Sequence, residues 1–390
     1  MVTREITSVV HRLTKQFPVI TITGPRQSGK TTLARAIFPQ YDYYSMEDPD
    51  IRELATTDPR GLLAGIKDGV VFDEIQRTPG LLSYIQGIVD SGGGKGRIIL
   101  TGSHQFELME GINQSLAGRT AILRLLPFTI AELRRIKKKQ NTDQFLIHGF
   151  YPGVHDKKQE PNIAYKNYFE TYIERDLRQM ITIKDLRLFR KFVKLCAGRI
   201  GQVFSASGLA NDVGVSVPTV QSWLSILEAS FIVLLLEPFY KNIGKRLIKS
   251  PKLYFYDTGL ASYLLGIETE SQMARDPLRG NLFENMVIME LVKKRYNQGL
   301  DHNLNFFRDS NGNEVDLLYR SGNNYIPVEI KAAETFNMEF LKGINYIRKI
   351  LPDETAKGYI VYAGQTEKPS GDFILINYKN TCSIIESPKE

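Results

Sequence analysis

Residues 24 to 31, GPRQSGKT, have the spacing G-x-x-x-x-G-K-[ST], which could bind a triphosphate. The glycines allow successive backbone N–H groups to point at the β-phosphate. Lys30 would neutralise β- and γ-phosphate oxygens, and the Thr31 hydroxyl would coordinate Mg2+. The alternative is a glycine-rich turn that binds nothing. The motif predicts a phosphate-binding loop whose contacts come from Gly24, Pro25, Arg26, Gln27, Ser28, Gly29, Lys30, Thr31 and Thr32.

Two adjacent carboxylates, Asp73 and Glu74, follow the apolar run at residues 70–72. Asp73 would hold the Mg2+ through water, and Glu74 would polarise the attacking water, so the two acids are predicted to have different roles. The alternative is a strand that ends in two solvated acids. We favour the catalytic interpretation because a complete phosphate loop precedes the pair.

A second group of charged residues surrounds the segment NEVDLLYRSGNNYIPVEIKAA at 313–333, which is typical of a β-hairpin. Alternation places Glu329 and Lys331 side by side, within reach of Asp316 if the strands are antiparallel. Glu284 is aligned with the apolar stripe of a helix, so its burial requires a cation, a metal ion or a donor. Clustered carboxylates could bind a hard divalent ion beside the lysine. The alternative is an ordinary cross-strand Glu-Lys pair plus an exposed aspartate.

Strands must position the first group of residues. The apolar runs PVITIT, GVVF and GRIIL precede the phosphate loop, the acid pair and a third polar end, Thr101-Gly102-Ser103. Since ligands gather at the carboxyl ends of parallel strands, we expect an α/β fold with a parallel sheet and helices on both faces. Thr101 or Ser103 could sense the γ-phosphate, or could cap the helix that begins near His104.

A helix-turn-helix pattern covers residues 205–231, where four apolar side chains share one face of the second helix: Val220, Trp223, Leu224 and Leu227. Its polar side carries Thr219, Gln221, Ser222 and Ser225, which could contact bases or phosphates. The next segment resembles a two-stranded wing with basic residues that could grip phosphates, namely Lys241, Lys245, Arg246, Lys249 and Lys252. Alternatively, this module packs against protein, and its basic residues are merely solvated.

Length and composition limit the class of protein. A chain of 390 residues predicts two or three domains, which we place at 1–155, 156–265 and 266–390. The formal net charge of +7 permits a polyanionic partner. Cys196 and Cys382 are the only cysteines, which argues against a disulfide framework. Neither a membrane span nor a signal peptide is evident, so we expect a cytoplasmic protein.

The order of the phosphate loop, VVFDEIQ, ILTGS, LAGR and LPFTIAEL resembles prokaryotic AAA+-type ATPases that carry a C-terminal domain of unknown function. YFYDTGLASYLLG and GNLFENMVIMEL extend the resemblance over most of the chain. It implies ATP and Mg2+ as cofactors. It also implies that Arg119 is an arginine finger, which would require a homo-oligomer if the finger is supplied in trans. The sequence departs from many AAA+ proteins at Thr101-Gly102-Ser103, where those proteins place an asparagine.

The C-terminal third resembles the PD-(D/E)XK nuclease-like fold. That resemblance implies that Asp316 and Glu329 coordinate Mg2+, that Glu284 completes the metal site, and that Lys331 orients water or stabilises charge on the phosphate. We therefore expect an ATPase that acts on or binds DNA under nucleotide control. Its nuclease-like domain either cleaves DNA with a metal ion or only binds nucleic acid or protein, and the sequence leaves both roles open. The alternative is a nucleotide-operated switch that recruits a protein partner and carries an inactive nuclease-like fold.

Overall fold

The computed structural model describes residues 2–92, 94–103, 111–112, 114–136, 140–176, 185–240 and 248–385, without the side chains of 173–176. The chain forms two compact units. The N-terminal unit contains Met1–Phe128 with Ala229–Phe231 and Arg295–Leu300, and the C-terminal unit contains Thr129–Glu228, Ile232–Lys294 and Asp301–Glu390. The break after Phe128 precedes the boundary expected near residue 155.

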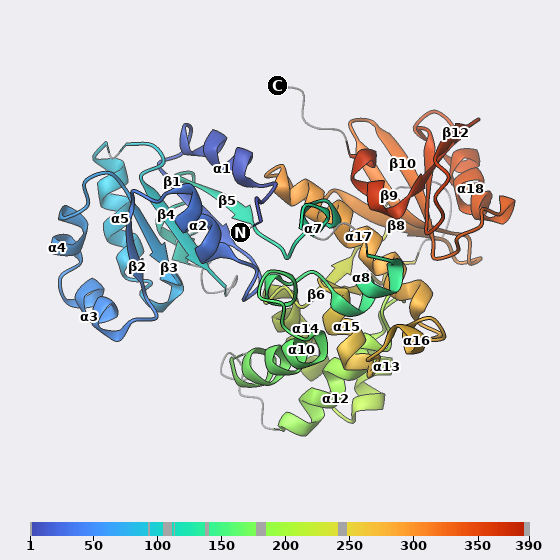
Figure 1. Cartoon of the computed structure of the whole chain (residues 1–390), viewed down its shortest axis with the longest axis horizontal. Helices are drawn as coiled ribbons and strands as arrows, with labels where there is room; N and C mark the ends of the chain where they lie inside the picture. Colours follow the sequence, from blue (N-terminus) through green and yellow to red (C-terminus); the bar gives the residue numbers. More distant parts are fainter. Residues whose placement is uncertain are drawn as a thin grey trace. The chain divides into compact units, whose positions relative to one another are not determined.

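A parallel sheet forms the centre of the N-terminal unit, as the apolar runs predicted (Figure 1). Its strand order is β2-β3-β4-β1-β5. Strand β4 therefore lies between the strand that leads to the phosphate loop and the strand that leads to the acid pair. The strands are β1 (Val19–Thr23), β2 (Asp42–Ser45), β3 (Val70–Asp73), β4 (Ile98–Gly102) and β5 (Thr120–Arg124).

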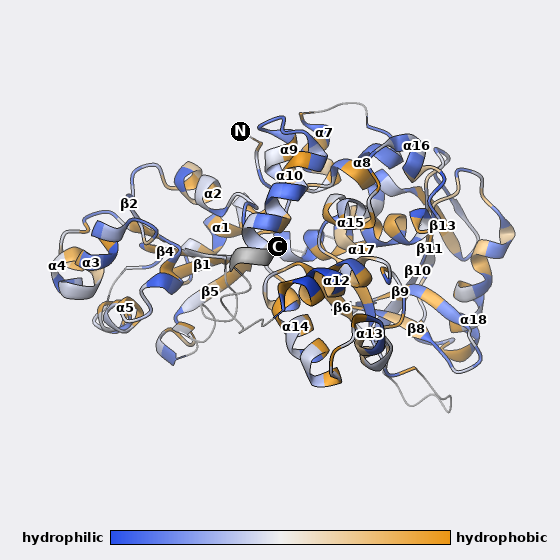
Figure 2. Cartoon of the chain, turned by 90° about the horizontal axis from the view of Figure 1, so that it is seen from below, coloured by the Kyte–Doolittle hydropathy of each residue, from blue (hydrophilic) through white to orange (hydrophobic). Residues whose placement is uncertain are grey.

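Helices cover both faces of this sheet, and its three central strands β1, β3 and β4 are buried throughout, as strands covered on both sides must be. Val71 and Ile99 pack with α1 (Thr7–Thr14) and α2 (Lys30–Ile37). Phe72 and Leu100, on the opposite face, pack with α3 (Pro49–Thr57), α4 (Pro59–Ala64) and α5 (Leu81–Asp90). Figure 2 shows the apolar residues of β1 and β4 in orange. A short 3-10 helix, η1 (Ile75–Arg77), follows β3.

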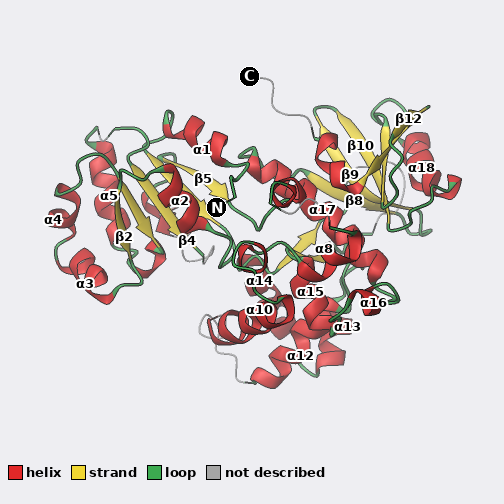
Figure 3. Cartoon of the chain, viewed as in Figure 1, coloured by secondary structure: helices red, strands yellow, loops and turns green. Residues whose placement is uncertain are grey.

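The first part of the C-terminal unit is mainly helical (Figure 3). Its helices are α7 (Ile130–Arg134), α8 (Thr142–His148), α9 (Pro152–His155), α10 (Pro161–Tyr168), the π-helical η2 (Phe169–Asp176), α12 (Leu186–Ala197), α13 (Ala206–Val213), α14 (Val217–Ala229), α15 (Thr258–Leu265) and α16 (Glu270–Met273). Helices α13 and α14 meet at Gly214 and form the predicted pair, with Val220, Trp223, Leu224 and Leu227 buried. An antiparallel pair follows, β6 (Val233–Leu236) and β7 (Lys252–Phe255).

The second part of the C-terminal unit is an α/β structure. The long helix α17 (Arg279–Asn297) precedes a sheet of order β12-β13-β11-β10-β9-β8. Strands β8, β9 and β10 are antiparallel, and β11 pairs in parallel with β10 after the helix α18. The bounds are β8 (Leu304–Arg308), β9 (Glu314–Ser321), β10 (Asn324–Lys331), η3 (Met338–Leu341), α18 (Lys342–Ile350), β11 (Gly358–Tyr362), β12 (Lys368–Ser370), β13 (Phe373–Asn377) and η4 (Tyr378–Ile384).

Three of the predicted wing cations, Lys241, Lys245 and Arg246, lie outside the described residues. Lys249 is exposed, as expected of a wing residue. Across the ranges that the structure describes, we find no helix both long and apolar enough to cross a membrane.

Candidate functional site

The phosphate loop connects β1 to α2, and at Gly24 it lies close to the backbone of Leu125. This residue has φ +147°, and a Cβ atom there would lie 2.1 Å from the backbone oxygen of Leu125, so only glycine fits. Arg4 supports the loop from outside. Its guanidinium donates to the backbone oxygen of Ser28 at 2.9 Å and to that of Leu126 at 2.5 Å. No spacing rule pointed to Arg4, because it precedes the motif by 20 residues.

Lys30 points into the loop, as the motif requires. It is only 5% exposed, and its Nζ donates to the backbone oxygens of Gly24 at 3.0 Å and Pro25 at 2.9 Å. Burial lowers the pKa of Lys30, while the nearby carboxylates of Glu74 and Asp73 oppose that shift. A buried ammonium in a loop of this shape is suited to phosphate oxygens.

Asp73 lies beside Thr31 and receives more hydrogen bonds than the sequence predicted. The Thr31 hydroxyl lies 3.0 Å from both carboxylate oxygens, so the two proposed Mg2+ ligands are adjacent. Thr101 also donates to Asp73, and the Tyr43 hydroxyl donates at 2.8 Å. Burial, together with the hydrogen bond to Asp73, raises the pKa of Tyr43. Tyr43 was missed because only the sheet order brings β2 next to β3.

Glu74 is held in place by polar partners beyond the end of β3. Its carboxylate accepts from the Ser103 hydroxyl at 2.8 Å and from the Gln76 amide. Its backbone is left-handed, with φ 55° and ψ 46°, a conformation that costs a non-glycine residue on the order of 1 kcal/mol. A phosphate sensor or a helix cap was expected of Thr101 and Ser103. In the structure Thr101 donates to Asp73 and Ser103 donates to Glu74.

Arg119 does not lie near the phosphate loop of its own chain. It immediately precedes Thr120, which pairs with Val19 at the start of β1, whereas the loop follows the other end of β1. Five strand residues separate these edges, about 16 Å at 3.3 Å per residue. Arg119 instead forms two hydrogen bonds with Asp90, at 2.6 and 3.0 Å. In this arrangement Arg119 is too far from the loop of its own chain to act there, so an arginine finger supplied in trans stays a prediction.

The C-terminal unit brings Asp316, Glu329 and Lys331 together at one end of β9 and β10. The Lys331 Nζ lies 2.8 Å from Asp316 and 2.7 Å from Glu329. The backbone N–H of Ile330 also donates to Asp316, at 2.7 Å. The antiparallel pairing of the two strands produces this convergence, as the alternation predicted.

Glu284 joins this group from α17. Its partner is Lys252, a residue that the sequence pattern placed in the wing. Lys252 was expected to be an exposed wing residue that grips phosphate, and this expectation is wrong. Lys252 is 2% exposed, and its Nζ lies 3.1 Å from Glu284 and 2.5 Å from Glu314. The Tyr254 hydroxyl donates to Glu284 at 2.5 Å. We call Lys252, Glu284, Glu314, Asp316, Glu329 and Lys331 the carboxylate-lysine cluster.

The pKa shifts in this cluster reflect burial and close charges. Burial raises the pKa of Glu329 well above its usual range, and the neighbouring Asp316 adds to the effect. Burial also acts to raise the pKa of Asp316, but Lys331 and Lys252 outweigh it, so that pKa is lowered. Burial raises the pKa of Glu284, and Lys252 opposes this shift.

The predicted metal ligands do not form a metal site in this arrangement. Within the described ranges, no three His, Cys, Asp or Glu side chains are placed to hold one metal ion. Asp316 is close enough to raise the pKa of both Glu284 and Glu329, but these carboxylates face two ammonium groups, those of Lys252 and Lys331. The structure therefore brings the four predicted residues together as an ionic network.

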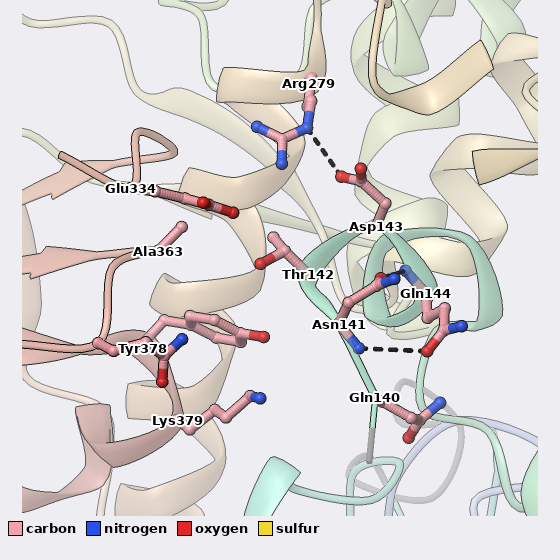
Figure 4. A pocket seen from close by; sticks show the side chains of 11 residues that line it. Gln140, Asn141, Thr142, Asp143, Gln144, Arg279, Glu334, Ala363, Tyr378 and Lys379 are labelled. Atoms are coloured by element: carbon pink, nitrogen blue, oxygen red, sulfur yellow. Dashed lines mark hydrogen bonds and ion pairs between the residues drawn. The ribbon is translucent and has the colours of Figure 1, made fainter. Parts of the chain in front are cut away.

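A polar cavity of about 570 Å³ lies where β10, β11 and β13 end. Glu334, Ala363 and Tyr378 follow these three strands and line the cavity together with residues of α8 (Figure 4). Arg279, at the start of α17, donates to Asp143 at 2.7 Å. Burial, reinforced by Arg134, lowers the pKa of Lys379, whose side chain also lines the cavity.

Three family models match the chain. One, described as an AAA domain, matches residues 16–134. Two are described as domains of unknown function, DUF8612 over residues 139–271 and DUF4143 over residues 279–381. With the phosphate loop, the parallel sheet and the acid pair in place, the first segment is an AAA+-type P-loop ATPase domain, and it binds nucleotide.

The chain belongs to the same family as Rv2008c of Mycobacterium tuberculosis and Mb2031c of Mycobacterium bovis, both described as uncharacterized proteins. It is 30% identical to each over 377 residues, which cover 95% of this chain and 82% of the relative. Among solved structures, it is similar to the Walker-type ATPase PABY2304 of Pyrococcus abyssi, with 15% identity and a TM-score of 0.45. That match covers 67% of this chain and 94% of the other.

Proposed function

We propose that the N-terminal unit hydrolyses ATP with Mg2+. The observation that carries this proposal is the contact of Thr31 with Asp73 at the base of the loop, with Glu74 beside it. Hydroxyl and carboxylate oxygens suit a hard cation, so Thr31 and Asp73 would hold Mg2+, which would neutralise phosphate charge. Lys30 would bind the β- and γ-phosphates, and Glu74 would orient the attacking water.

The Tyr43 hydroxyl should affect this site through its hydrogen bond to Asp73. Tyr43→Phe removes one donor to that carboxylate and nothing larger, so we expect the half-saturating Mg2+ concentration for ATP hydrolysis to rise about tenfold. The measurement is steady-state phosphate release across a Mg2+ titration. Tyr41→Phe is the matched control, since the Tyr41 hydroxyl donates to the backbone oxygen of Gly96 at 3.1 Å and not to Asp73. Equal Mg2+ dependence in both variants would show that Tyr43 has no role there.

For the C-terminal unit we propose a PD-(D/E)XK nuclease-like domain behind a winged-helix-like module. The order helix, three antiparallel strands, helix and parallel strand in α17-β8-β9-β10-α18-β11 supports the first assignment. The helix pair α13–α14, followed by the antiparallel β6 and β7, supports the second. Gln221, Ser222 and Ser225 are exposed on α14, where they could contact phosphates or base edges.

We therefore propose that nucleotide binding controls binding of DNA. Fluorescence anisotropy of labelled duplex and single-stranded DNA, with and without a non-hydrolysable ATP analogue, tests this. We expect an affinity that the analogue changes in the wild type but not in Lys30→Ala, and that falls as salt is raised. Gln221→Glu should weaken binding roughly tenfold by repelling phosphate, whereas Gln16→Glu, the same change on the exposed surface of the N-terminal unit, should not.

A second candidate is a nucleotide-operated switch that recruits a protein partner through an inactive nuclease-like fold. In the carboxylate-lysine cluster, Lys252 and Lys331 pair with two of the carboxylates that a nuclease would use for its metal ion, and this favours an inactive nuclease-like fold. Absence of DNA binding at low salt would make this the better proposal. Cleavage of DNA with Mg2+ or Mn2+ that Asp316→Ala abolishes would reject it.

A further inference from the structure

Lys252 enters the carboxylate-lysine cluster from outside the α/β part of the C-terminal unit. It is the first residue of β7, whose partner is β6. Its ammonium contacts carboxylates of two different elements, Glu284 on α17 and Glu314 on β9. The centroid of the Phe306 ring lies 5.5 Å from the Lys252 Nζ. A buried ammonium in these surroundings is stable only while its carboxylate partners remain.

The charges of the cluster are nearly balanced by protein groups. Glu284, Glu314, Asp316 and Glu329 contribute four carboxylates. Opposite them lie Lys252, Lys331 and Arg308, the last at 3.2 Å from Glu314. A divalent ion brought to these oxygens would have to displace or repel an ammonium that already has two short contacts.

Helix α18 closes the cluster at Glu329. A Cβ atom at Gly343 would lie 2.0 Å from Oε1 of Glu329 and 2.5 Å from the backbone oxygen of Glu314, so the helix backbone rests directly on this carboxylate. Six water or ligand oxygens around a metal ion need more space than this contact leaves on that side. The carboxylate oxygens are suitable ligands for a divalent metal ion, but the neighbouring ammonium groups and the backbone of α18 leave no place for one.

We propose that the Lys252 ammonium takes the place of a divalent metal ion in the cluster, excludes such an ion, and attaches strand β7 to the α/β part of the unit. The inference rests on the nuclease-like assignment made above, but not on DNA binding or ATP hydrolysis. It makes Lys252 a structural residue and predicts a protein without metal-dependent cleavage.

Binding of Mn2+ to the full chain without nucleotide tests the exclusion. Free Mn2+ is measured by electron paramagnetic resonance for the wild type, Asp316→Asn and Glu329→Gln. We expect the wild type and both variants to bind equal amounts of Mn2+, since any ion at Asp73 is unaffected by these substitutions. One Mn2+ per chain that either substitution abolishes would overturn the proposal.

Thermal unfolding tests the attachment. Lys252→Met keeps the apolar stem but leaves the partly buried Glu284 without its cation and Glu314 with Arg308 alone, so we expect the melting temperature to fall by about 5 °C or more. Lys342→Met removes one charge from an exposed pair with Glu339 and should leave it unchanged. Equal melting temperatures would overturn the proposal. Neither Mn2+ binding nor thermal unfolding depends on DNA. A protein that fails to bind DNA can therefore still confirm or overturn this inference.

Discussion

Lys30→Ala is expected to reduce ATP hydrolysis by at least about 100-fold, because it removes the ammonium that the motif directs at the β- and γ-phosphates. The Lys30 Nζ lies inside the loop, within 3.0 Å of the Gly24 and Pro25 oxygens, and a bound triphosphate would offer it stronger partners. Lys30→Arg should be almost as damaging, since a planar guanidinium does not fit a buried position shaped for an ammonium.

Phosphate release and binding of a fluorescent ATP analogue measure these effects. Lys67→Ala is the matched control, because Lys67 is an exposed lysine of the same unit. We expect the control to retain wild-type hydrolysis and binding. If Lys30→Ala kept more than a tenth of the wild-type rate, the assignment of residues 24–31 as the catalytic phosphate loop would have to be abandoned.

Glu74→Gln is expected to reduce hydrolysis by about 10²- to 10³-fold while leaving ATP affinity within about threefold of the wild type. Glutamine keeps the size of the side chain and can still bond to Ser103, but it cannot accept a proton from water. Since Glu74 is held by Ser103 at 2.8 Å and is not part of the loop, its loss should spare binding.

The control for this prediction is Glu47→Gln, the same chemical change near the loop. Glu47 is half exposed and pairs with Arg77 at 3.5 Å and with Arg26 at 3.9 Å. We expect its kcat to change by less than about twofold. Parallel loss of binding and hydrolysis in Glu74→Gln, or equal rates in the two variants, would remove the catalytic role of Glu74.

The phosphate loop and the central sheet could be predicted because their signals are local. The loop requires particular residue types at fixed spacing, and the runs that contain Val71 and Ile99 are apolar throughout, as strands buried on both faces must be. The convergence of Asp316, Glu329 and Lys331 was also predictable, since a hairpin with period-two alternation leaves few other arrangements. Arg119 shows the limit of prediction from local signals. The sequence suggested an arginine finger after a glycine, but the register of β5 places Arg119 beside the start of β1, whereas the phosphate loop follows the end of β1.

By itself, the sequence determined the nucleotide-binding loop, the alternation of strands and helices, and the residue types of both charged groups, because each depends on neighbours within one or two elements. Only the tertiary structure decided which residues complete them. Tyr43 reaches Asp73 through the sheet order, and Lys252, expected at a solvated wing, is buried between Glu284 and Glu314. The reason is physical: a lysine is stable either in solvent or when buried beside carboxylates that are distant in the sequence, and only the packing of the chain decides which of the two environments it has.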